Sequence, residues 1–156
     1  MDRKKKKKTV LPHFVPVPKN LEEEICIQFH LVSCMDFNGH MSPRVYFTAR
    51  NIQNDANLTI TIVHHALSHW PGDLPEVLYF QFDNTSRENK NQVLFSYLNM
   101  LVELGLFKKG KVGFLLVGHT HDHIDQMFSH FSRTLRRRKF KILPSLIEIV
   151  RKAYHP

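Results

Sequence analysis

The sequence predicts an α/β fold in which two neighbouring strands precede an alternation of helices and strands. Short runs of β-forming and apolar residues are separated by longer segments whose apolar residues recur every three or four positions. The resulting order is strand, strand, helix, strand, helix, strand, helix, helix. Alternation in the second half predicts parallel strands joined by right-handed crossovers. A length of 156 residues suits one domain.

The first part of the chain is expected to form an arm and a hairpin. Residues 1–20 are basic and contain three prolines, which favour irregular, extended structure, and residues 21–156 are expected to form a single domain. The β-forming runs 24–35 and 44–49 are separated by turn residues and predict two paired strands.

The next three elements are a helix, a buried strand and a second helix. Residues 54–70 have helical spacing despite several β-branched residues, and residues 77–82 form a short apolar run typical of a buried strand. Thr85 and Glu88 fit a capping box at the start of the second helix. Gly105 is expected to end it.

The last three elements are a strand and two helices. Residues 111–118 predict another buried strand. Apolar residues from Ile124 to Leu135 at steps of three and four predict a helix, and Pro144 is expected to open a final helix over 145–154.

Positive charge is concentrated at two places. The formal charge is +8, yet residues 1–8 contribute +5 and residues 133–141 contribute +6, which leaves −3 for the rest. This pattern predicts a polyanion partner, DNA or RNA, or a nuclear-import signal for the lysine run. A solvated tail and a solvated helix end are the alternatives. The residues expected to contact nucleic acid are Arg133, Arg136, Arg137, Arg138 and Lys139.

The remaining composition favours an intracellular protein, with the nucleus as the candidate compartment. Apolar runs such as "FLLV" are far shorter than the roughly 20 residues of a membrane span. The charged start is followed by prolines instead of the apolar segment of a secretory signal. Cys26 and Cys34 are therefore expected to be reduced and buried.

Polar clusters follow two of the predicted parallel strands. Asp83 ends one strand, and the stretch "FLLVGHTHDHID" places His119 after the other. Sites of parallel sheets gather at such strand ends. His121 and Asp125 are four residues apart, as metal ligands on one helix face would be. The alternatives are a turn role for Asp83 and a plain helix start capped by Thr120.

Two short resemblances concern the histidines alone. "LLVGHTH" resembles the last GHxH element of calcineurin-like metallophosphoesterases, whose other blocks are absent. "HTHDH" resembles the metal motif of metallo-β-lactamase folds but is one residue short. Both would imply a metal-dependent phosphoesterase centred on His119 and His121.

A third resemblance covers roughly residues 9 to 150. "LYFQFDNTSRENKN", "FLLVGHTHDHIDQMFS" and the earlier "NDANLTI" together resemble a eukaryotic domain of unknown function found in transposable-element-derived proteins. That family looks like a ribonuclease H-like transposase core, a mixed sheet with flanking helices. Its acids bind two Mg²⁺, or Mn²⁺, for phosphodiester cleavage.

Carried over by position, the resemblance implies that Asp83 and Asp125 are catalytic acids and metal ligands, with His119 and His121 beside them as further ligands. The core's first strand, which bears another metal acid, is expected to be missing here, with Asp2 at best its neighbour. The resemblance therefore implies nucleic-acid binding with a partial divalent-metal site. Whether the domain is an active Mg²⁺-dependent nuclease, an inactive or truncated relative, or a non-catalytic binding module stays open.

Overall fold

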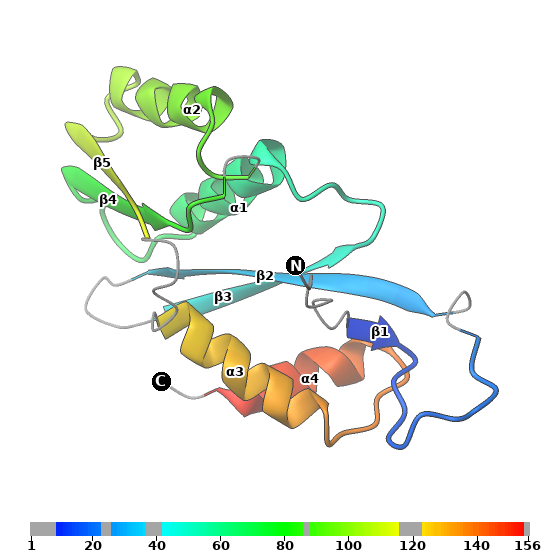
Figure 1. The fold of residues 1–156 in the computed structure, drawn as a ribbon. Helices are drawn as coiled ribbons and strands as arrows, with labels where there is room; N and C mark the ends of the chain where they lie inside the picture. The colour runs from blue at the N-terminus through cyan, green and yellow to red at the C-terminus, as the bar shows by residue number, and fades with distance from the viewer. Residues whose placement is uncertain (1–8, 23–25, 37–41, 86–87, 116–122, 155–156) are drawn as a thin grey trace. The chain divides into compact units, whose positions relative to one another are not determined.

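The chain folds into two compact units of mixed α/β structure. The terminal unit comprises residues 1–52 and 121–156, and the central unit comprises residues 53–120. All the helices and strands expected from the sequence are present, at least in part. The computed structural model (Figure 1) describes residues 9–22, 26–36, 42–85, 88–115 and 123–154.

The terminal unit contains an antiparallel sheet of three described strands. The expected hairpin is confirmed, because β2 (Ile27–Asp36) pairs from Phe29 to Asp36 with the whole of β3 (Ser42–Ala49). The sheet order is β1-β2-β3, and β1 (Thr9–Leu11) pairs antiparallel with the start of β2. Part of the expected irregular arm is therefore a strand. The β-forming residues 9–11 precede the first proline, and Leu11 is only 5% exposed.

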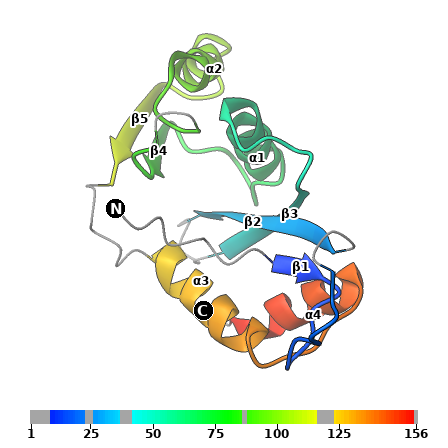
Figure 2. The same ribbon diagram turned by 45° about the vertical axis from the view of Figure 1, so that its right-hand side comes forward.

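Two helices cover one face of this sheet. Figures 1 and 2 show α3 (His123–Leu135) and α4 (Leu143–Ala153) side by side on it. Pro144 lies in the first turn of α4, as expected. Apolar side chains of the helices meet one face of the hairpin, including Phe29 and Phe47. The buried core of this unit consists of Leu11, Met127, Phe131, Phe140, Leu146 and Val150.

The central unit contains the expected parallel strands. Its elements are α1 (Ala56–Ser68), β4 (Val77–Phe82), α2 (Gln92–Glu103) and β5 (Lys109–Phe114), in that order. β4 and β5 pair in parallel and, among the described strands, form a sheet separate from the antiparallel one. Apolar residues of α1 and α2 pack with the strands around the buried residues Leu78, Leu94, Leu98, Leu101 and Phe107.

The starts of the two helices are fixed by side-chain caps. Asp55 caps α1 by accepting hydrogen bonds from the backbone at Asn57 and Leu58. The capping box expected at Thr85 and Glu88 is wrong, because α2 begins later, at Gln92, and Asn91 caps it. The Thr85 hydroxyl instead donates to Asp83, which holds this segment in a turn.

The end of α2 follows the expectation. Gly105 has a φ of +73°, a left-handed conformation that a glycine adopts without strain. The backbone N–H of Leu106 then bonds to the carbonyl of Leu101, as in a Schellman ending.

Burial of the parallel strands differs from the expectation. Leu78 is buried, but its neighbour Tyr79 is 67% exposed and Gln81 is also exposed. Successive side chains of a strand point to opposite faces, and α1 and α2 pack on only one of them. The apolar run "VLYFQF" therefore has one solvated side, contrary to the prediction of a buried strand.

Two smaller expectations concern membrane-spanning helices and the burial of the two cysteines. Within the described ranges, no helix is long and apolar enough to span a membrane. Cys26 and Cys34 are not joined in a disulfide, and both are of intermediate exposure, so they are less buried than expected. Cys26 precedes β2, and Cys34 lies near that strand's far end.

Candidate nucleic-acid interface

The cations after Phe131 form an exposed surface at the end of α3. Met127 and Phe131 face the core, so the helical period turns Arg133 away from it, and the remaining cations follow in the turn after Leu135. All five residues expected to contact nucleic acid are exposed. We name this set the basic end of α3, and it consists of Arg133, Arg136, Arg137, Arg138 and Lys139.

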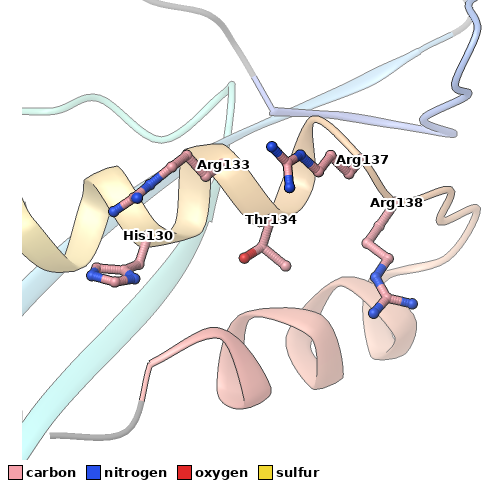
Figure 3. A pocket seen from close by; sticks show the side chains of 5 residues that line it. All are labelled: His130, Arg133, Thr134, Arg137 and Arg138. Atoms are coloured by element: carbon pink, nitrogen blue, oxygen red, sulfur yellow. The ribbon is translucent and has the colours of Figure 1, made fainter.

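Part of the basic end lines a cavity of about 350 Å³. Figure 3 shows the lining side chains in a row along α3 and the turn after it. His130 and Thr134 join three arginines there, and the ring of His130 packs edge-on against Tyr154, the residue that follows α4. His130, Arg133 and Thr134 lie three and four residues apart on one face of the helix, and Arg137 and Arg138 follow in the turn after it. The lining residues are His130, Arg133, Thr134, Arg137 and Arg138.

Within the part of the chain that the structure describes, the cations of the basic end lack acidic partners. The ion pairs found in the described part of the chain join Lys108 to Glu76 and Lys152 to Glu148, and none involves the basic end. Several like charges on one exposed surface repel one another and attract anions. A ligand rich in phosphate groups would satisfy both the charge and the hydrogen-bond donors of the guanidinium groups.

A second polar group lies at the carboxyl end of β4, in the central unit. One oxygen of Asp83, Oδ1, accepts hydrogen bonds from the backbone N–H of Thr85 at 3.3 Å and from its hydroxyl at 2.7 Å. The side-chain amide of Asn89 donates to the same oxygen. We name Asp83, Thr85 and Asn89 the strand-end cluster. It closes the turn between β4 and α2.

The stretch "DNTSRENKN" (83–91) has a local structural role at four positions. Asp83 and Asn89 bond to each other across the turn, and Asn91 caps α2. Lys90, between them, places its ammonium 5.5 Å from the ring centroid of Phe114, at the end of β5. The Oδ1 of Asn89 also lies 3.2 Å from the hydroxyl of Thr59 on α1. The turn role considered for Asp83 is thus present in the structure.

The strand-end cluster supplies only part of a metal site. All the hydrogen bonds that the described residues donate to Asp83 go to Oδ1, which leaves Oδ2 for another ligand. Mg²⁺ needs six oxygen ligands, including waters. Within the described ranges, no three His, Cys, Asp or Glu side chains form a group that could hold a metal ion. A single carboxylate oxygen does not define a metal centre.

The other expected ligands lie elsewhere. His119 and His121 are outside the described residues. Asp125 is exposed in the first turn of α3, where an acid complements the helix dipole. Asp83 belongs to the central unit and Asp125 to the terminal unit, so their pairing around a metal stays a prediction.

Three residues of these surfaces were not expected from the sequence. His130 and Thr134 line the cavity, and Asn89 anchors Asp83. Counting back three or four residues from the arginines along the same helix face would have found the first two. The short-range spacing from Asp83 to Asn89 carries no comparable rule, because a turn of six residues has no fixed geometry.

Comparison with known proteins identified one family. A family model described as a domain of unknown function (DUF7869) matches residues 19–156. Neither the curated proteins nor the solved structures contain a match to the chain.

Proposed function

The chain belongs to the DUF7869 family, a domain of unknown function, and we propose that it is a transposase-derived, ribonuclease H-like domain that binds nucleic acid through the basic end of α3. One observation carries the binding proposal: among the described residues, five exposed cations cluster without an acidic partner, and three of them line a cavity. Binding to phosphates by such clusters needs no particular base sequence.

The order of elements supports the ribonuclease H-like part of the proposal. Such a core begins with three strands, continues with a helix, and then alternates strands and helices. The chain has this order through α3. The first strand of the core was expected to be missing, but β1 occupies that place in the order. β1 consists of Thr9, Val10 and Leu11, none of which has a carboxylate. The proposal therefore covers binding and does not extend to cleavage.

Binding is tested by measuring fluorescence anisotropy of labelled duplex DNA and RNA between about 0.05 and 0.2 M salt. The variant replaces Arg133, Arg137 and Arg138 by Gln. Each phosphate contact removed should lower the slope of log K against log salt by about 0.9, because fewer counterions are released from a duplex. The triple substitution should therefore weaken binding most at low salt.

A matched control separates a local site from the overall charge. Replacing Lys19, Arg50 and Arg151 by Gln removes the same three charges from exposed positions outside the basic end. We expect this control to retain nearly the full salt slope of the wild-type protein. Equal loss in the two triple variants would contradict a site at the basic end and leave only attraction by net charge.

A divalent-metal site is the second candidate, favoured by the orientation of Asp83. Its Oδ1 is engaged by Thr85 and Asn89, so Oδ2 is the oxygen that a hard cation would contact. Calorimetric titration of Mn²⁺ into the wild type, Asp83→Ala and Asp125→Ala tests this candidate. Loss of Mn²⁺ binding in both variants would indicate that Asp83 and Asp125 belong to one metal site. Mn²⁺ binding that both variants retain would rule out these acids, and absence of any binding would reject the candidate. The phosphoesterase alternative depends on His119 and His121.

A further inference from the structure

The central unit has a second surface with the chemistry of a nucleic-acid site. It is the face of the β4–β5 sheet opposite the core. Leu78, Phe80 and Phe82 pack inward, so the alternate residues of β4 lie on the other face. The parallel register sets the alternate residues of β5 beside them. We name this surface the cationic sheet face, and it consists of Val77, Tyr79, Gln81, Lys109, Lys111 and Gly113.

Tyr79 at the centre of this face is the residue that core packing does not explain. Its exposed fraction is 67%, whereas the adjacent Leu78 is 7% exposed. An aromatic ring in the middle of a strand that stays in solvent presents a flat apolar surface to a partner. The neighbouring Gly113 and Gln81 do not cover it, since the first lacks a side chain and the second is itself exposed.

Two lysines surround this ring with positive charge. Lys111 donates a hydrogen bond from Nζ to the Tyr79 hydroxyl at 3.0 Å, and its ammonium lies 4.7 Å from the ring centroid. This hydrogen bond lowers the pKa of Tyr79, and the charge of Lys109 acts in the same direction. The nearby acid Glu76 is occupied by an ion pair with Lys108 at 2.6 Å. The face therefore combines an exposed ring with net positive charge.

We propose that the cationic sheet face binds a single-stranded nucleic acid, with a base stacked on Tyr79 and phosphates beside Lys109 and Lys111. Sequence-tolerant single-strand binders combine stacking aromatics with a cationic track in this way. A duplex would not suit the face, because its bases are already stacked on one another. This inference goes beyond the proposed function, since it concerns a different unit and a ring instead of an arginine cluster.

The test compares a single-stranded oligothymidylate of about 16 nucleotides with a duplex of the same length, using anisotropy. Tyr79→Val keeps a β-forming residue but deletes the ring. It should weaken single-strand binding by about 5- to 150-fold, the loss of one base stack, and change duplex binding by less than about 2-fold. Tyr79→Phe keeps the ring and should bind within about 2-fold of the wild type.

Two further variants make the stacking and phosphate contacts measurable separately. In Tyr79→Trp, the added indole fluorescence should be quenched by the oligothymidylate, after subtraction of the wild-type signal from Trp70. Lys111→Gln should lower the single-strand salt slope by about 0.7 for one lost phosphate contact. Circular dichroism of each variant checks that the strands remain folded.

The outcomes separate this inference from the proposed function. Unchanged single-strand binding in Tyr79→Val would overturn the inference, and so would equal losses in Tyr79→Val and Tyr79→Phe. A loss shared by duplex and single strand would also overturn it. If the triple arginine variant instead leaves duplex binding intact, the basic end of α3 is rejected as a binding site. The Tyr79 variants still test the cationic sheet face independently.

Discussion

The strand-end cluster and the basic end of α3 differ in where their polar groups find partners. Asp83 receives three hydrogen bonds from within its own turn, and its anchor Asn89 also lies within hydrogen-bonding distance of Thr59 on α1. The basic end has no acidic partner among the described residues, although it carries five cations. One group is satisfied by the fold and the other only by solvent or a ligand.

This difference separates structural from ligand-binding roles more sharply than residue type does. An acid at a strand end suits a metal ligand and a turn equally well from the sequence. In the structure its hydrogen bonds link both ends of the turn, as a turn role requires. Removing Asp83 should therefore cost stability, whereas removing cations of the basic end should cost binding and leave stability almost unchanged.

The largest stability effect is expected for Asp83→Ala. The substitution removes the acceptor of three hydrogen bonds, and we expect a loss of about 1–2 kcal/mol in the free energy of unfolding, reduced from the value for buried charged groups because Asp83 is exposed. Urea unfolding followed by circular dichroism measures it. Asp83→Asn keeps an acceptor oxygen and should lose less than about 1 kcal/mol. A negligible loss in Asp83→Ala would show that the turn holds without the cluster.

The fold was predictable where local pattern and packing agree. Leu94 and Leu98 repeat at helical spacing and do face the core of the central unit, and Gly105 ends the helix as glycine should. The start of that helix was not predictable in the same way. Thr85 and Asn91 are both good caps, and only the bond from Thr85 to Asp83 decides between them.

Burial was harder to predict than the elements themselves. The run "VLYFQF" contains five apolar residues, which favours a strand buried on both sides, yet Tyr79 is exposed because the helices pack on one face. The candidate site likewise has one part that the local sequence predicts and one part that it does not. The five cations expected to contact nucleic acid from the concentration of charge at 133–141 are exposed, as a binding surface requires. The metal pairing of Asp83 with Asp125 depends on contacts between distant segments, which no local pattern specifies.

A smaller effect should appear as a pH dependence next to the basic end. The backbone of His13 pairs with that of Phe140, at 2.7 and 3.1 Å, and their rings stack with centroids 4.7 Å apart. Burial lowers the pKa of His13 from 6.5, although a hydrogen bond to the Leu135 backbone opposes this. The folded protein thus favours neutral His13, and the unfolded chain takes up the proton first as the pH falls.

Stability from this contact should therefore be complete above pH 6.5 and be lost as the pH falls below it toward the folded-state pKa of His13. Urea unfolding at about pH 5 and about pH 7.5 measures the change. His13→Phe can stack on Phe140 without titrating, so it should show a weaker dependence in this range. The same dependence in both proteins would assign it to other groups.

The smallest effect is expected for Arg137→Gln, and it bears most directly on the comparison. Arg137 lies two residues beyond the end of α3, so removing this cation relieves at most the repulsion of about 0.2–0.5 kcal/mol found for like charges four residues apart on a helix. The substitution also removes a favourable charge just past the helix C-terminus. The two terms oppose each other, so the free energy of unfolding should change by less than about 0.5 kcal/mol. Urea unfolding of this variant beside Asp83→Ala measures both sides of the contrast. A loss above about 1 kcal/mol in Arg137→Gln would mean that the arginine is held by the fold after all, and the basic end would then lose its distinction from the strand-end cluster.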